Sequence, residues 1–190
     1  MQDTEIIKIF NLKYPQLKYP LDTSVMYFIF KKIMVGYIDE KLIKEIQKLE
    51  LSQKHILTNL LCMYDKFDAI KKINLYYVSN NIDSDDFEEN MTSSTINNNL
   101  LILNSTDADS ACYGMNHKLV KQLYYENIKP TQDGANYASD NNDIELLKLL
   151  ITWNIKPIYT AVNTAIWRNS RGEKNTLEIL QKNEIMNNCK

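Results

Sequence analysis

Apolar residues recur along the chain at the spacing of a helix that buries one face. In the segment 143–151, apolar residues at positions 144, 147 and 151 fall on one side of such a helix. Asn142 or Asp143 supplies a capping side chain at its start, and Pro157 lies beyond its end, where a helix cannot continue. The pattern therefore predicts a helix here, and similar patterns predict helices along most of the chain.

The helical segments repeat at an interval of 27 residues. The tetrapeptide Asn-Ile-Lys-Pro occurs at 127–130 and again at 154–157, and the same interval relates 42–46 to 69–73 in the N-terminal half. Five units follow, anchored near Met34, Leu61, Ala111, Ala138 and Ala165. Each unit is predicted to be two helices joined by a turn. A unit of this size cannot bury its own apolar face, so neighbouring units are expected to stack and form a shared core.

The two halves of the chain are out of phase, because Leu61 and Ala111 are 50 residues apart, four fewer than two periods. The segment 81–105 between the halves holds the acidic run 83–89, a polar Ser/Thr/Asn tract and the apolar run Leu100–Leu103. The acidic and polar parts predict a solvated loop, since they have little apolar surface to offset ordering entropy. The apolar run predicts a degenerate helix that bridges the halves.

Four regions follow from this division. They are an N-terminal capping segment (1–33), degenerate helical repeats (34–80), the acidic and polar loop with its short apolar segment (81–105), and three repeats with a C-terminal cap (106–190).

Composition supports a helical fold. The chain has only four glycines and four prolines, whereas sandwiches and barrels need many tight turns that draw on these residues. Apolar residues make up 44% of the 190 residues and charged residues 24%, which is ordinary for a globular protein. We therefore expect an all-α fold.

Two stretches resemble the ankyrin repeat. Residues 138–150 resemble the pattern Ala-Ala-x-x-Gly-His-x-Glu-Val-Val-Lys-Leu-Leu, with Asn142 in place of the turn glycine. Residues 160–166 are similar to the opening Thr-Pro-Leu-His-x-Ala-Ala, with Asn163 at the histidine position. An ankyrin unit has ~33 residues, so a 27-residue period leaves room only for trimmed fingers, and the ~34 residues of the tetratricopeptide unit fit no better. The resemblance implies stacked helical hairpins in a short ankyrin-like solenoid, of the kind encoded by large DNA viruses.

Charge and segment composition restrict the expected surroundings. The net charge of −2 and the pI of about 5.7 come without a block of lysines, so nucleic acid is not an expected partner. No apolar run approaches the ~20 residues of a membrane span, and the acidic N-terminus is unlike a secretory signal. The three cysteines form no CxxC pair, which is typical of reduced thiols in the cytoplasm or nucleus.

The sequence shows no constellation of catalytic or metal-binding residues. Cys112 and His117 are five apart but have no second pair, so we expect Cys112 to pack in the core. The glycines stand too far apart for a phosphate loop, and Gly114 and Gly134 are expected in turns. The paired carboxylates lie in the acidic loop, which offers no burial to shift their pKa values. We expect no cofactor and no enzymatic activity.

Aromatic residues indicate where a partner would bind. In ankyrin-like stacks the outer face of the first helix of each unit lines the concave surface, and exposed Tyr, Trp and Arg are common binding hot spots. Trp167 with Arg168 is the favoured anchor, although these aromatics could instead pack against a neighbouring loop. The full set of expected partner-binding residues is Tyr113, Tyr137, Asp140, Asn141, Thr164, Trp167 and Arg168. The aromatics at the ends of the second helices, Tyr124, Tyr125 and Trp153, are expected to pack in the core or between repeats.

Two functional hypotheses remain open. The first is a module that binds a protein partner, which would be a host regulatory or ubiquitin-pathway protein if the chain is viral. The second is a structural, virion-type protein that self-assembles into a homo-oligomer through its unpaired end repeats.

Overall fold

The computed structural model describes residues 20–82, 100–172 and 175–182. These residues form helices and no strand, which confirms the predicted all-α class. The helices are α2 (Pro20–Met34), α3 (Glu40–Gln47), α4 (Leu51–Met63), α5 (Phe67–Ile82), α7 (Ser105–Tyr113), α8 (His117–Tyr125), α9 (Gln132–Asp140), α10 (Ile144–Thr152), α11 (Tyr159–Ser170) and α12 (Asn175–Lys182). Among the described residues, none of these helices is long and apolar enough to cross a bilayer.

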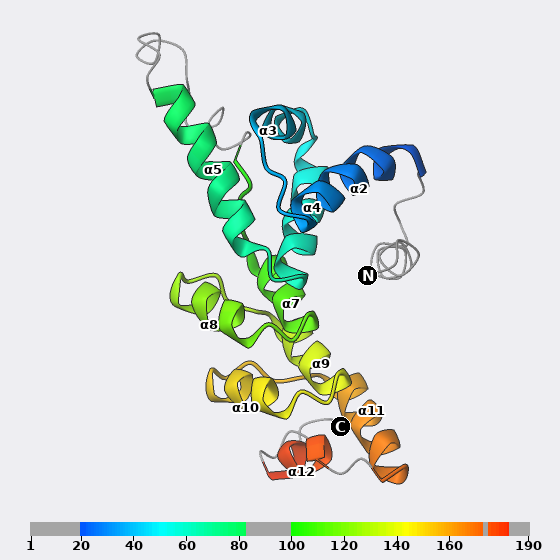
Figure 1. Ribbon diagram of the computed structural model, residues 1–190. Helices are drawn as coiled ribbons and strands as arrows, with labels where there is room; N and C mark the ends of the chain where they lie inside the picture. Colours follow the sequence, from blue (N-terminus) through cyan, green and yellow to red (C-terminus); the bar gives the residue numbers. More distant parts are fainter. Residues whose placement is uncertain (1–19, 83–99, 173–174, 183–190) are drawn as a thin grey trace.

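The helices form five successive pairs, which is the number of units expected from the sequence. The first helices of the pairs are α2, α4, α7, α9 and α11, and the second helices are α3, α5, α8, α10 and α12. Each first helix packs against its own second helix and against the next first helix along the chain. The pairs follow one another down an elongated column, with α8, α10 and α12 in successive layers on one side (Figure 1).

The 27-residue interval is reproduced by the boundaries of the elements. The helices α7 and α9 begin and end 27 residues apart, and so do α8 and α10. The turn inside the pair contains a residue with left-handed backbone angles, Met115 in one unit and Asn142 in the next. Ala111, Ala138 and Ala165 are all buried within first helices, as predicted. The repeat seen in the sequence therefore corresponds to a repeat of structure.

The second helices bury the same three positions in every pair, which creates the apolar stripe that faces the first helices. These positions are Leu42, Ile43 and Ile46 in α3, Ala69, Ile70 and Ile73 in α5, Leu119, Val120 and Leu123 in α8, Leu146, Leu147 and Leu150 in α10, and Thr176, Leu177 and Leu180 in α12. The core is thus continuous from pair to pair.

Polar side chains begin these helices. Asp143 is the N-cap of α10 and accepts a hydrogen bond from the Leu146 backbone N–H at 3.1 Å. Asn142 occupies the turn instead, with a φ of 56°. Asn116 caps α8 in the same way, and Asp39 caps α3. Each cap satisfies a backbone N–H that has no partner within its own helix.

The link between the two halves differs from the prediction. Leu100–Leu103 is not helical, so the expected degenerate helix is wrong. The Leu101 side chain is buried, and the Asn74 side-chain amide on α5 bonds both the N–H and the C=O of Leu101, at 2.9 and 3.0 Å. Because one side chain of α5 already satisfies this backbone, the segment needs no helical turn to enter the core. The acidic run 83–89 lies outside the described residues.

Two glycines allow close approach of neighbouring helices. Gly134 was expected in a turn, but it lies inside α9, where a Cβ would meet Asp109 Oδ1 at 2.7 Å and Cys112 Sγ at 3.1 Å on α7. The turn prediction for Gly134 is therefore wrong. Gly114 follows α7 as its C-cap, and the backbone carbonyl of Met63, at the end of α4, occupies the space that a Cβ would need.

Candidate protein-binding surface

The expected partner-binding residues fall on three positions that repeat every 27 residues. One position holds Tyr113, Asp140 and Trp167 on α7, α9 and α11. The other residues of the set occupy the two neighbouring positions of the same helices: Tyr137 and Thr164 lie three residues earlier in the helix, and Asn141 and Arg168 lie one residue later. The set therefore follows one side of three successive first helices.

The structure brings three of these residues into direct contact. The rings of Tyr113 and Tyr137 meet edge to face, with centroids 5.2 Å apart. The Asn141 side-chain amide donates to the Tyr113 carbonyl at 3.0 Å, which ties α9 to the end of α7. Both tyrosines are half-buried, so they combine packing between repeats with partial access to solvent.

Trp167 is the most accessible aromatic residue of the set. Its side chain is 57% exposed, and the guanidinium of Arg171 lies 4.6 Å above its ring. Arg168 and Thr164 are half-buried. Arg171 was not among the expected residues, although its position four residues after Trp167 on α11 is the spacing at which helical side chains meet.

Carboxylates make the surface around Tyr137 negative. Burial raises the pKa of Tyr137, and the nearby carboxylates of Asp133, Asp109 and Asp140 raise it further. One carboxylate oxygen of Asp140, Oδ1, is shielded from solvent and accepts no hydrogen bond from the described residues. This part of the surface thus favours hydrogen-bond donors and positive charge.

The aromatics of the second helices differ from one another. Tyr124 of α8 stacks on Trp153 at the end of α10, with ring centroids 3.7 Å apart and planes 7° from parallel. This confirms their expected packing between repeats. Tyr125 is 80% exposed, so the same expectation for Tyr125 is wrong. Tyr125 follows Tyr124 by one residue, a rotation of roughly 100° around a helix, and therefore points away from the neighbouring pair.

A buried carboxylate joins two first helices. Asp109 on α7 accepts hydrogen bonds from Thr131 N at 2.7 Å, Thr131 Oγ1 at 2.7 Å and Gly134 N at 3.0 Å, all at the start of α9. Burial raises its pKa, although these hydrogen bonds act in the opposite direction. One repeat later, Asn136 Oδ1 accepts from Ile158 N at 2.8 Å at the start of α11. The sequence analysis missed this link, whose signal is a polar residue between buried alanines at a 27-residue interval.

The Cys112 and His117 pair does not form a metal site. Cys112 is buried next to Gly134, and burial raises the pKa of its thiol, which confirms the expected core packing. His117 Nε2 instead lies 2.6 Å from Asp143 Oδ2, the N-cap carboxylate of α10. No group of three or more His, Cys, Asp or Glu residues within the described ranges could hold a metal ion.

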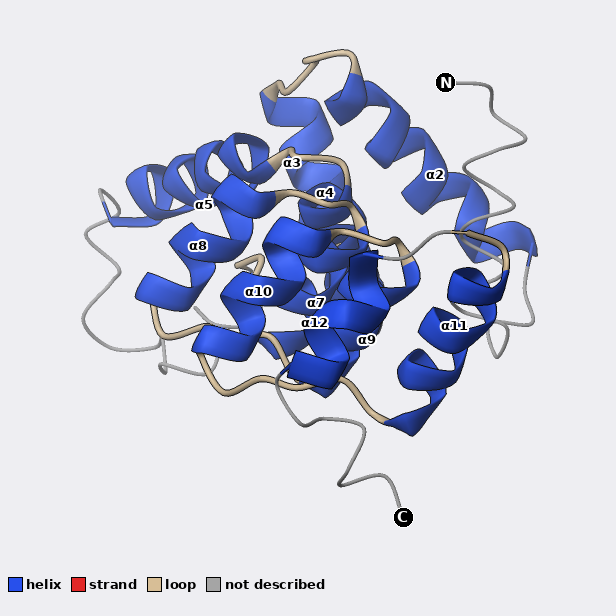
Figure 2. Cartoon of the chain, turned by 90° about the horizontal axis from the view of Figure 1, so that it is seen from below, coloured by secondary structure: helices blue, strands red, loops and turns tan. Residues whose placement is uncertain are grey.

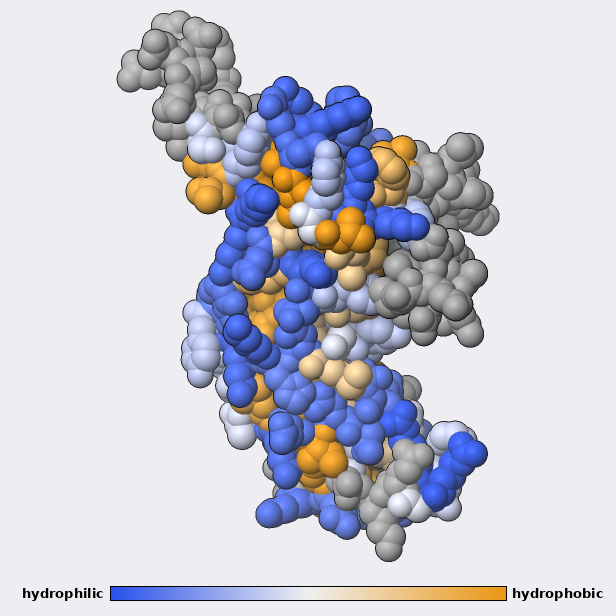
Figure 3. Space-filling model, in the orientation of Figure 1, coloured by the Kyte–Doolittle hydropathy of each residue, from blue (hydrophilic) through white to orange (hydrophobic). Residues whose placement is uncertain are grey.

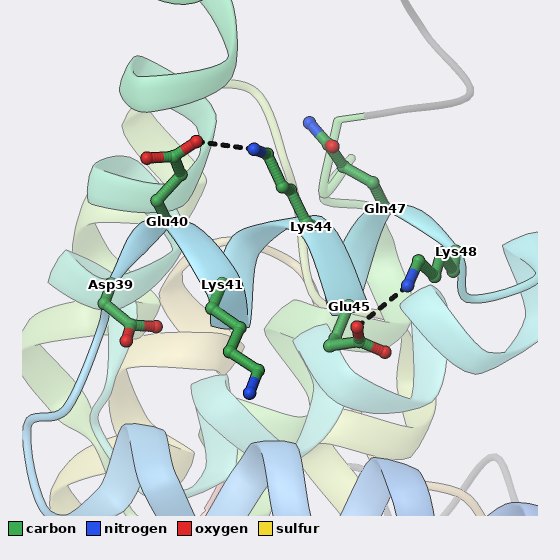
Figure 4. A pocket seen from close by; sticks show the side chains of 7 residues that line it. All are labelled: Asp39, Glu40, Lys41, Lys44, Glu45, Gln47 and Lys48. Atoms are coloured by element: carbon green, nitrogen blue, oxygen red, sulfur yellow. Dashed lines mark hydrogen bonds and ion pairs between the residues drawn. The ribbon is translucent and has the colours of Figure 1, made fainter.

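The depression over α3 is the surface of a single helix. Its volume is about 760 Å³, and its lining residues are Asp39, Glu40, Lys41, Lys44, Glu45, Gln47 and Lys48, all from α3 and its two flanks (Figure 4). Lys44 pairs with Glu40 at 2.5 Å and Lys48 with Glu45 at 2.8 Å, which are exposed pairs along one helix. Because no second element faces these side chains, the depression is a solvated helix face and not a binding cleft.

The face of the molecule seen in Figure 3 is mainly hydrophilic, with apolar atoms in separate patches. Binding through individual anchor side chains is therefore better suited to this protein than binding through one broad apolar surface. Comparisons with protein-family models, with curated proteins and with solved structures found no match to this chain.

Proposed function

We propose that this chain is a non-catalytic protein-interaction module, built as a short ankyrin-like solenoid of helical hairpins. It binds a protein partner with the side of the first helices that carries Tyr113, Asp140 and Trp167. The single observation that carries the proposal is that these residues occupy one repeated position on α7, α9 and α11, ending in an aromatic side chain that is 57% exposed.

The ankyrin-like arrangement is supported by the order and spacing of the helices. Five helix pairs follow one another, and each first helix contacts the next. The connections 126–131 and 153–158 between pairs contain no strand, which fits fingers trimmed to short loops. Stacks of this type use their extended concave surface for binding.

The chemistry of the surface supports a partner that presents basic or hydrogen-bond-donating side chains. Trp167 offers an exposed aromatic face of the kind enriched among binding hot spots. Asp140 and Asp133 supply negative charge near Tyr137. The viral resemblance of the repeats favours a host regulatory or ubiquitin-pathway protein as the partner.

The proposal is tested by affinity capture from a host-cell extract with mass-spectrometric identification of bound proteins. The test variant carries Trp167→Ala and Arg168→Ala, and the matched control carries Tyr125→Ala, which removes an exposed aromatic from a second helix. We expect the wild type and the control to retain the same partner and the test variant to lose at least tenfold in affinity, as hot-spot truncations do. Capture of no specific partner, or undiminished capture by the test variant, would contradict the proposal.

A further inference from the structure

The two faces of a first helix play different roles where neighbouring pairs meet. On α7, Asp109 and Cys112 face the following helix, because both lie against Gly134 of α9. On α9, Asn136 bonds Ile158 N, and the Ser139 hydroxyl donates to the Ala161 carbonyl of α11 at 3.5 Å. We call the face that carries these residues the forward face, and the face opposite it, which carries Gly134 on α9, the backward face.

The forward face of α11 has no following helix in the part of the chain that the structure describes. Its residues at the same repeated positions are Asn163 and Ile166. In the inner pairs the position of Ile166 is held by Cys62, Cys112 and Ser139, and all three are completely buried. Ile166 is instead 43% exposed, and Asn163 is exposed as well. In the view from that end of the column, α11 lies at the margin of the molecule (Figure 2).

The backward face of α2 is uncovered in the same sense. Gly36, with a φ of 82°, marks the turn of the first pair, as Asp65 and Asn142 mark the turns of later pairs. Eight residues before the turn lies Phe28 in α2, where α4 and α9 have Leu57 and Gly134. Leu57 is fully buried, whereas Phe28 is 55% exposed and Val25, one helical turn earlier, is 49% exposed.

Both ends of the row of first helices therefore present large apolar side chains at positions that are buried at the inner junctions. Terminal units of a repeat stack normally carry a polar outer face, because nothing covers them. The inner junctions also determine which surface each end fits: a forward face always meets a backward face. The forward face of α11 is thus complementary to the backward face of α2, and not to a second α11.

We propose that a second copy of this chain docks end to end, with the α2 backward face of one copy packed on the α11 forward face of the other. Ile166 and Phe28 are the central contacts, and Asn163 lies at the position from which Asp109 and Asn136 bind the start of the next first helix. The contact is heterologous, so each dimer keeps one free α2 face and one free α11 face and can add further copies. The proposal does not rest on the partner-binding surface, because it uses neither Trp167 nor Arg168.

Sedimentation velocity of the full chain over a wide concentration range tests this arrangement. The variants are Ile166→Glu and Phe28→Glu, and the control is Leu75→Glu, which alters a side chain that is 69% exposed on α5, away from both faces. Since all three side chains are exposed, circular dichroism should show an unchanged helical content. We expect the wild type and the control to assemble as concentration rises, and each single variant to remain monomeric.

Mixing the two variants distinguishes head-to-tail docking from a symmetric contact. Ile166→Glu leaves the α2 face intact, and Phe28→Glu leaves the α11 face intact. An equimolar mixture should therefore form dimers and stop there. A wild type that is monomeric at every concentration, a mixture that remains monomeric, or assembly that is abolished by Ile166→Glu but not by Phe28→Glu would overturn the proposal.

Discussion

The N-terminal and C-terminal first helices are joined in different ways. α4 buries large apolar side chains, including Leu57, Leu60 and Leu61, whereas α9 buries Gly134, Ala135, Ala138 and Ser139. In the repeat, Leu61 corresponds to Ala111 and Ala138. The N-terminal half therefore gains its stability from apolar area removed from water, while the C-terminal half depends on small residues and buried hydrogen bonds.

The junction between α4 and α7 combines both devices. The Ser110 hydroxyl donates to Asn59 Oδ1 at 3.0 Å, and Gly114 leaves space for the Met63 carbonyl. One architecture thus tolerates two kinds of contact, provided that the volume and the polar groups match at each junction. Four predictions test this comparison.

The largest effect is expected from Gly114→Val. A Cβ at this position would overlap the Met63 backbone carbonyl, and backbone cannot move aside without separating α4 from α7. We expect a loss of about 3 kcal/mol or more in the free energy of unfolding, measured by urea denaturation. Gly172→Ala is the control, because it meets only open space, and its φ of 93° should cost about 1 kcal/mol. Equal effects of the two substitutions would disprove close approach at the junction.

Opposite substitutions at one repeated position sharpen the comparison of the halves. Leu61→Ala should leave a cavity in α4 and cost about 2 to 5 kcal/mol. Ala111→Leu should overfill the corresponding site in α7 and cost about 1 to 3 kcal/mol. Both are measured as shifts in the midpoint of chemical denaturation. If Ala111→Leu were neutral, the C-terminal junctions would be loosely packed, contrary to the structure.

Removal of the Asp109 carboxylate tests the polar link. Asp109→Ala leaves two backbone N–H groups and one hydroxyl of the α9 start without their acceptor, which should cost about 2 to 3 kcal/mol. Asp133→Ala, which removes an exposed carboxylate three residues from Gln132–Asp140's buried Ala138 side, is the control and should change stability by less than about 0.5 kcal/mol. Comparable losses in both variants would argue against a specific role of Asp109.

Stability should also depend on pH through Asp109. Because burial raises its folded-state pKa above the ordinary value of 3.8, folding favours the protonated form. This contribution is complete below pH 3.8 and is lost as the pH rises through the raised folded-state pKa. The free energy of unfolding of the wild type minus that of Asp109→Asn should therefore fall across this window. A difference that increases with pH would mean that the hydrogen bonds outweigh desolvation.

The smallest effect concerns the stacked rings of the second helices. A double-mutant cycle of Tyr124→Leu and Trp153→Leu should give a coupling energy of about 0.5 to 1.5 kcal/mol, because their rings stack at 3.7 Å. The pair Tyr125 and Trp153 serves as a control, since Tyr125 is exposed, and its coupling should be near zero. A coupling for Tyr125 as large as that for Tyr124 would contradict the stacking.

The candidate surface shows where prediction from sequence ends. The 27-residue interval was sufficient to place Tyr113, Asp140 and Trp167 at one repeated position, because equal spacing in regular helices gives equal orientation. It could not separate the half-buried Tyr113 and Tyr137 from the exposed Trp167. That difference depends on whether another pair follows the helix in question.

The sequence by itself determined the helical class, the five pairs and the buried stripe of each second helix, since all of these follow from periodic spacing along the chain. Only the tertiary structure decided that Gly134 accommodates Asp109, that Asn74 binds the backbone of Leu101, and that Tyr124 packs while Tyr125 is exposed. These features join residues that are distant in sequence. Their energies depend on which surfaces come within contact distance, and local periodicity carries no information about that.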